Sequence, residues 1–178
     1  MTTVKYMILL LTVLLQSCGD SKIADDISKM QSRPIDLTSC DGAVCYERGR
    51  EVIYDEDSSG DRLIIYIDSQ SCSQCFISHM YDYDETVNEL SSSGIETLFL
   101  FEPNHEQEAG VTEILEHQAY PFRIVVVKNG GFSKANPHLP SSSIFHSFLI
   151  NKDNEVVIVG NPVRNDKIKK LMLNSVKR

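Results

Sequence analysis

A buried strand that runs directly into a Cys-x-x-Cys motif is the feature that most restricts how this 178-residue chain can fold. The strand is predicted over residues 63–68, a run of apolar, β-branched and aromatic side chains that ends in an acid. Residues 69–71 form a turn, Cys72 and Cys75 follow, and a helix is expected from about Cys75 to Leu90. A strand of this kind is buried on both faces, so the sequence predicts a sheet packed between helices.

The predicted helix over residues 75–90 is amphipathic, because its large apolar residues recur every three or four positions. They are Phe76, Met80, Tyr83, Val87 and Leu90. The sequence Ser-Ser-Ser-Gly at residues 91–94 ends the helix.

The other segments complete a pattern of strands and helices. In order, they are a hairpin over residues 44–55 that turns near Arg48-Gly49-Arg50, a strand over 95–101, a helix over 106–118, a strand over 122–127, a long loop over 128–143, two strands over 146–150 and 155–159, and a basic C-terminal helix that starts after Asn161-Pro162. Parallel strand–helix units followed by an antiparallel hairpin predict an α/β fold with a mixed central sheet flanked by helices.

The predicted chemistry lies in Cys72-Ser73-Gln74-Cys75. Backbone N–H groups at a helix start are unpaired and the helix dipole is positive there, so both favour a thiolate over a thiol. We predict Cys72 as the nucleophile and Cys75, one turn further on, as the resolving cysteine. Asp68 is a candidate proton shuttle, and a turn-forming role is its alternative. No organic cofactor is expected, because sulfur performs the chemistry.

The first 17 residues have the composition of a secretory signal, with one lysine and then an apolar run over residues 6–15 that is short for a membrane span. Leu15-Gln16-Ser17-Cys18 resembles a bacterial lipobox, which implies cleavage before Cys18 and a diacylglycerol on its sulfur. An ordinary signal peptide with a chance cysteine is the alternative. We expect a lipid anchor on a membrane of the bacterial cell envelope, with the domain outside the cytoplasm.

Removal of those 17 residues from the 178 would leave 161 and, by taking one lysine, would move the formal net charge from −8 to −9. Such an acidic chain lacks the basic surface of a nucleic-acid binder. We predict a tether or extension over residues 18–43 and a domain over 44–178. Disulfides persist outside the cytoplasm, so Cys40 and Cys45 are predicted to form a local structural disulfide. A relay to Cys72 and Cys75 is the alternative.

The strand–CxxC–helix unit and the hairpin "FLINKDNEVV" together resemble the thioredoxin fold. The sequences "YPFRIVVVKNGG" and "HSFLINKDNEVVIVG" resemble its TlpA-like and peroxiredoxin-type branch, whose bacterial members are often membrane-tethered. The resemblance covers residues 63–176. It implies that Cys72 attacks and Cys75 resolves, with a protein dithiol or disulfide of the cell envelope as partner. Ser71 stands where the family commonly has Trp, and Phe145 where it has a cis-proline. We expect a monomer.

Two other functions fit the same residues. The first is a surface lipoprotein that uses the fold as a binding module, with Cys72–Cys75 as an inert disulfide. The second is a metal-handling protein in which Cys72 and Cys75 bind the ion together with His79 and His146.

Overall fold

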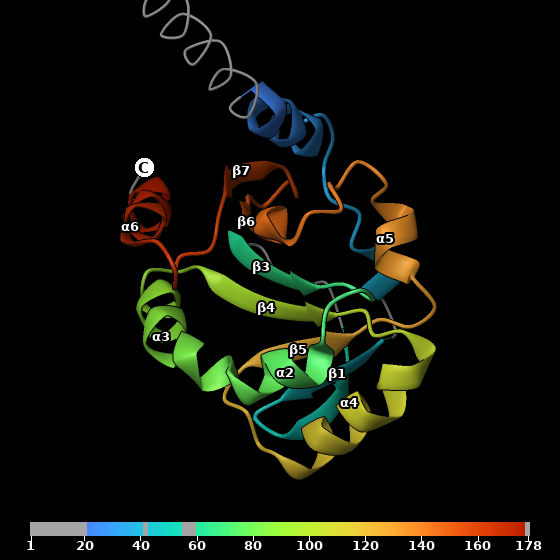
Figure 1. Cartoon of the computed structure of the whole chain (residues 1–178). Coiled ribbons are helices and arrows are strands. Elements are labelled where there is room, and N and C mark those ends of the chain that lie inside the picture. Colours follow the sequence, from blue (N-terminus) through green and yellow to red (C-terminus); the bar gives the residue numbers. More distant parts are fainter. Residues whose placement is uncertain (1–20, 41–42, 55–59, 177–178) are drawn as a thin grey trace, which may run out of the picture.

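The computed structural model describes residues 21–40, 43–54 and 60–176. These residues contain one seven-stranded sheet with the order β2-β1-β5-β4-β3-β6-β7 (Figure 1). Its strands are β1 (Val44–Glu47), β2 (Arg50–Ile53), β3 (Arg62–Ile67), β4 (Glu96–Phe101), β5 (Arg123–Val126), β6 (Ser147–Ile150) and β7 (Val156–Val159). Strands β3, β4 and β5 are parallel, and the pairs outside them are antiparallel. The predicted mixed α/β sheet is therefore confirmed.

Helices cover both faces of this sheet (Figure 1). The helical segments are a helix over residues 21–30, then α2 (Ser73–Ser78), α3 (Asp84–Ser92), α4 (His105–His117), α5 (Gly131–Ala135) and α6 (Asp166–Ser175), with 3₁₀ turns η1 (Thr38–Cys40), η2 (Met80–Tyr83) and η3 (Ser143–Phe145). Helices α2, α3, α4 and α6 lie on one face, whereas α5 and the N-terminal segment lie on the other.

Strand β3 forms the centre of the fold because all six of its residues are buried. Side chains alternate along a strand, so Leu63, Ile65 and Ile67 join the core beneath α2, α3, α4 and α6, which we call the helix-side core. Ile64 and Tyr66 join the opposite layer, which we call the α5-side core. A continuous apolar run is what burial on both faces requires.

The hairpin predicted over residues 44–55 is confirmed, with β1 paired to β2 around Arg48 and Gly49. Both turn residues have positive φ, 51° and 74°, which a two-residue hairpin turn favours. Gly49 also lies against α4's end, where an added Cβ would come within 2.6 Å of the Ala119 Cβ. Glycine is therefore required here both by the backbone and by the space.

The segment predicted as a tether packs onto the domain over residues 30–40. Met30, Ile35 and Leu37 are buried in the α5-side core, each at most 2% exposed. The backbone N–H of Ile35 also bonds the Asn154 carbonyl oxygen at 2.8 Å. The packed unit thus begins before residue 44, because these apolar side chains fill the layer over β3 and β6.

The single helix predicted over residues 75–90 is divided into α2, η2 and α3. The buried residues across the division are Ile77, Met80, Tyr83 and Thr86, each three positions after the last. A 3₁₀ turn has three residues per turn, so it keeps such side chains on one face where an α-helix would rotate them away. Of the predicted inward residues, Met80, Tyr83 and Leu90 are buried, and Phe76 and Val87 are partly buried against the same core.

Two further segments differ from the sequence-based prediction. Residues 128–143 were expected as a loop but contain α5, whose Phe132 is fully buried. The C-terminal helix begins at Asp166 with Asn165 as its cap, rather than at Asn161-Pro162. Asn161 instead donates a 2.9 Å hydrogen bond from Nδ2 to the Tyr83 hydroxyl, which joins this segment to η2.

The predicted signal segment and Cys18 lie outside the described residues. Over residues 21–40, 43–54 and 60–176, no helix combines the length and the apolar character that crossing a membrane requires.

Candidate functional site

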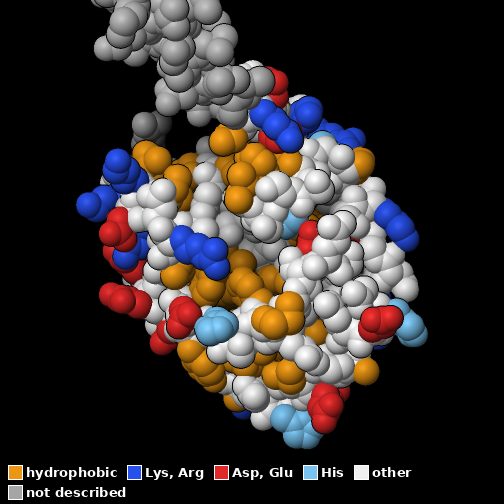
Figure 2. All heavy atoms as spheres, in the orientation of Figure 1, with side chains coloured by type: hydrophobic (Ala, Val, Ile, Leu, Met, Phe, Trp, Pro, Cys, Tyr) orange, Lys and Arg blue, Asp and Glu red, His pale blue; other side chains and the backbone are white. Residues whose placement is uncertain are grey.

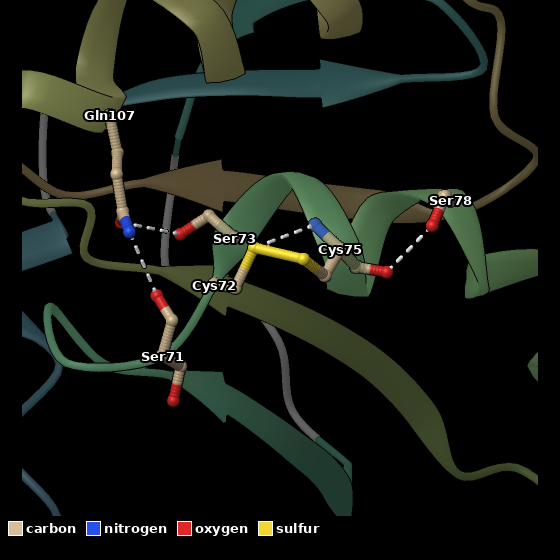
Figure 3. The surroundings of a disulfide bond; sticks show 6 residues. All are labelled: Ser71, Cys72, Ser73, Cys75, Ser78 and Gln107. Carbon is tan, nitrogen blue, oxygen red and sulfur yellow. Dashed lines mark hydrogen bonds between the residues drawn. A yellow bond between two sulfur atoms is a disulfide. The ribbon is translucent and has the colours of Figure 1, made fainter.

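A disulfide joins Cys72 and Cys75 where β3 leads into α2 (Figure 3). Cys72 caps the helix with an extended backbone, and its Sγ accepts a 3.3 Å hydrogen bond from the Cys75 backbone N–H. Both cysteines are exposed, so a second sulfur can approach them from solvent. The predicted nucleophile and resolving residue are thus brought together at the surface.

The turn before Cys72 is shaped by Asp68. Its Oδ1 accepts from the Ser71 backbone N–H at 2.9 Å, from the Ser71 hydroxyl at 2.6 Å and from the Gln70 N–H at 3.2 Å. These contacts are those of a turn-forming aspartate. The proton-shuttle role of Asp68 stays a prediction.

Helix α4 holds the motif through Gln107, a residue the sequence analysis did not identify. Its Nε2 donates to the Ser71 carbonyl oxygen at 3.1 Å, and its Oε1 accepts from the Ser73 hydroxyl at 3.3 Å (Figure 3). Ser73 is fully buried, so this hydroxyl depends on a protein partner. Gln107 lies four residues before the buried Val111, on the same face of the helix. A polar residue on an otherwise apolar helix face is the sequence feature that could have identified Gln107.

The two helices that carry these residues are close together. Gln74 lies between the two cysteines in the sequence. A Cβ built at Gly110 of α4 would come within 2.1 Å of the Gln74 Nε2 atom. The absence of a side chain at Gly110 therefore leaves room for the Gln74 side chain against α4.

An aromatic cluster packs against the residue that follows the motif. Phe76, the residue after Cys75, has its ring 5.8 Å from that of Phe101 and 5.5 Å from that of Tyr83. Tilted and edge-on pairs at this spacing add stability beyond the buried area. In Figure 2, hydrophobic side chains gather over the region of α2, and most charged side chains lie towards the rim of this face.

The electrostatic support for a Cys72 thiolate is local. Because α2 has six residues rather than the predicted 16 or so, its dipole is that of a short helix. The Cys75 N–H that bonds Cys72 Sγ is the contact that favours the charged form.

The other face of β3 carries a buried polar pair. The Tyr66 hydroxyl donates a 2.6 Å hydrogen bond to Glu102 Oε2, and Glu102 Oε1 accepts from the backbone N–H groups of Phe132 and Ser133 at 2.8 and 3.1 Å. Burial first, and then the Glu102 carboxylate, raise the pKa of Tyr66 well above its ordinary value. Glu102 is 1% exposed, so these three donors are what keep it in the interior.

The four predicted metal ligands are not assembled into one site. His79 is exposed and lies 3.7 Å from Asp82, whereas His146 is buried and bonds the Pro140 carbonyl oxygen with Nε2 at 2.9 Å. No group of three or more His, Cys, Asp or Glu side chains within the described ranges is arranged to hold an ion.

Cys40 and Cys45 are fully buried thiols in the α5-side core. The predicted disulfide between them is therefore not present in the structure. Cys40 ends the 3₁₀ turn η1 and Cys45 lies on β1, and each packs into the apolar layer as a small hydrophobic residue. Burial raises the pKa of the Cys45 thiol.

Comparison with known proteins gives structural matches only. No family model and no curated protein matches the chain. Peroxiredoxin Q of Xanthomonas campestris superposes with a TM-score of 0.53 at 12% identity, over 83% of this chain and 97% of that one. The bacterioferritin comigratory protein of the same organism, described with alkyl peroxide reduction activity, gives 0.52 at 13% identity, again over 83% and 97%.

A third match is the exposed lipoprotein thioredoxin of Streptococcus pneumoniae, with a TM-score of 0.49 at 16% identity over 75% of this chain and 96% of that one. At identities this low, the first two matches establish the fold and leave the chemistry to be argued from the site itself.

Proposed function

The chain has the thioredoxin fold, and from that premise we propose that it is a thiol–disulfide oxidoreductase that exchanges electrons with a protein partner through Cys72 and Cys75. The observation that carries the proposal is the exposed disulfide whose Cys72 Sγ accepts from the Cys75 N–H. That N–H can stabilise the Cys72 thiolate that forms when the disulfide opens. The second thiol, that of Cys75, lies three residues further along the chain.

In the reduced form, the Cys72 thiolate attacks one sulfur of a partner disulfide. A Cys72–partner S–S bond forms while the partner's second sulfur leaves as a thiolate and takes a proton from solvent. Cys75, as a thiolate, then attacks Cys72 Sγ, the Cys72–Cys75 bond forms, and the partner's first sulfur leaves as a thiolate. The chain loses two electrons and the partner gains them. The same steps in reverse oxidise a partner dithiol.

A trapping experiment tests this proposal. The reduced Cys75→Ser variant, mixed with a disulfide substrate such as insulin, should accumulate a covalent complex through Cys72, whereas Cys72→Ser should form none. The wild-type chain should catalyse insulin reduction with dithiothreitol as the electron source. A reduction potential below about −300 mV together with no turnover would identify the bond as an inert structural disulfide instead and refute the proposal.

We further propose that the domain is tethered outside the cytoplasm by lipid on Cys18, for which the lipobox-like Leu15-Gln16-Ser17-Cys18 is the support. A diacylglycerol with a further acyl chain supplies enough buried methylene groups for stable membrane association. Mass spectrometry of the mature N-terminus is the test. The expected product begins at Cys18 with the added lipid mass, and an unmodified Cys18 would contradict the anchor.

A further inference from the structure

A polar cavity of about 220 Å³ opens beside the CxxC turn, on the side of β3 opposite α2. Its wall is made by the end of β3, the following turn, α5 and the segment before β6. The polar side chains that line it include Tyr66, Asp68, Glu102, Asn136 and His146. Ser69 and Gln70, which precede Cys72 by three and two residues, also line it, so the cavity is close to the disulfide along the chain.

Most of these polar groups are already satisfied within the protein. Glu102 accepts from the Tyr66 hydroxyl and from two backbone N–H groups. Asn136 accepts from the Asp36 N–H at 2.8 Å and donates to the carbonyl oxygens of Asp36 and Phe132. These side chains build the wall of the cavity, and the atoms that make these hydrogen bonds have no need of a ligand.

His146 is different, because it is 5% exposed and its Nδ1 has no hydrogen-bond partner within the described residues. Its Nε2 lies 2.9 Å from the Pro140 carbonyl oxygen. A carbonyl only accepts, so Nε2 carries the hydrogen, and in the neutral imidazole Nδ1 is an acceptor.

The group that faces His146 Nδ1 is also an acceptor. Asp68 Oδ2 lies 3.9 Å away, and the other oxygen of the same carboxylate is occupied by the turn. This distance is too long for a direct hydrogen bond, and with a neutral imidazole a third group that donates to both atoms would satisfy the two acceptors. Among the described residues, no Lys or Arg side chain lines the cavity to do so.

We propose that this cavity binds the ammonium or guanidinium group of a lysine or arginine in the protein partner. The inference rests on the proposed oxidoreductase function, because it makes the cavity a specificity pocket beside the reacting cysteines. A cation with several N–H donors satisfies both acceptors and neutralises Asp68. The volume is below the range of small-molecule and cofactor sites, and it suits the end of one side chain.

Binding can be tested without any redox turnover. The oxidised chain is titrated with n-butylammonium and methylguanidinium while the His146 imidazole is followed by NMR, with n-butanol as the neutral control. We expect saturable shifts of the His146 resonances with the two cations only. Asp68→Asn keeps an oxygen for the turn and should abolish the shifts, whereas the exposed Asp82→Asn, which removes the same charge, should leave them. Shifts that are absent in the wild-type chain would mean that water alone fills the cavity and would overturn the proposal.

Selectivity is tested with two disulfide peptides that differ only in Arg or Gln beside the cysteine. We expect the reduced chain to react about tenfold faster with the Arg peptide, which is the rate ratio that the free energy of one charge-assisted hydrogen bond corresponds to. Asp68→Asn should lose this difference in rate between the two peptides. Loss of a proton shuttle would slow both peptides alike and leave the ratio unchanged. Equal rates for both peptides in the wild-type chain refute the pocket and leave the oxidoreductase function intact, whereas no reaction with either peptide refutes the function itself.

If Asp68→Asn does not fold, His146→Gln replaces it in the peptide experiment. The glutamine amide keeps an N–H for the Pro140 carbonyl oxygen and removes the ring Nδ1. The expected result is the same loss of the peptide ratio, and retention of that ratio by this variant would contradict the proposal.

Discussion

Gln107 donates a hydrogen bond from Nε2 to the carbonyl oxygen of Ser71 at 3.1 Å, and so ties α4 to the residue that precedes Cys72. The same amide accepts from the buried Ser73 hydroxyl on the other side of Cys72. The backbone around the proposed nucleophile is therefore positioned by a neighbouring helix as well as by its own turn.

We predict that Gln107→Leu raises the pKa of Cys72 in the reduced chain. Without the amide, the segment from Ser71 to Ser73 is less fixed, and the Cys75 N–H is less well placed to stabilise the Cys72 thiolate. Each lost hydrogen bond is worth about 1 kcal/mol, so thiol–disulfide exchange at neutral pH should slow by about two- to tenfold. The pH dependence of Cys72 alkylation measures the pKa directly.

The matched control is Gln118→Leu, the same substitution at the far end of α4. It should leave the alkylation profile of Cys72 unchanged. A Gln107→Leu chain with reduced stability but an unaltered Cys72 profile would show that Gln107 only joins the helices and does not tune the sulfur.

The CxxC context could be predicted from sequence because it depends on neighbours along the chain. An apolar run, a turn and a capped helix start are local signals, and they correctly place Cys72 and Cys75 at the junction of β3 and α2. Gln107 and His146 reach the site from elsewhere in the chain, so their role depends on how elements pack, which periodicity does not encode.

Elements with ambiguous local signals were the ones misjudged. Asn161 and Asn165 offer the same capping residue four positions apart, and the contact of Asn161 with Tyr83 decides between them. Residues 131–135 are too short to show a helical period, although α5 buries Phe132 fully. In each case a tertiary contact overrides the local preference.

A second prediction concerns the buried carboxylate of Glu102. Tyr66→Phe removes the hydroxyl that donates to Glu102 Oε2, which leaves a buried acceptor unsatisfied. We expect the free energy of unfolding to fall by about 1–3 kcal/mol in urea titrations. Tyr81→Phe, at a side chain 56% exposed, is the control and should change stability very little. Equal stability of Tyr66→Phe and the wild-type chain would mean that water replaces the hydroxyl.

The same tyrosine gives a prediction for alkaline pH. The pKa of Tyr66 is raised above the ordinary value of 10.0 in the folded chain, so above that pH the unfolded chain releases this proton first. The stabilising contribution is complete below pH 10 and is lost as the pH rises, with a slope of up to about 1.4 kcal/mol per pH unit. Tyr66→Phe should therefore lose stability less steeply than the wild-type chain between pH 10 and 11. Parallel slopes in urea titrations would exclude the effect.

A third prediction separates buried thiols from a disulfide at Cys40 and Cys45. In the native oxidised chain, iodoacetamide should modify both cysteines at least about a hundredfold more slowly than a free thiol, because reaction requires the core to open. In urea without reductant, both should be alkylated, as peptide mass spectrometry would report. Two peptides that stay unmodified until a reductant is added would instead demonstrate a bond between them.

The last prediction tests whether the segment before β1 belongs to the folded unit. Leu37 is 1% exposed within the α5-side core, whereas Ile23 in the preceding helix is 44% exposed. Leu37→Ala should lower the free energy of unfolding by about 2–5 kcal/mol, because it removes buried methyl groups and leaves a cavity under a layer that cannot fully collapse. Ile23→Ala should cost less than about 0.5 kcal/mol. Urea titrations of the two variants give the comparison, and equal small losses would mean that residues 30–40 are a loosely attached tether whose packing adds nothing to the stability of the sheet.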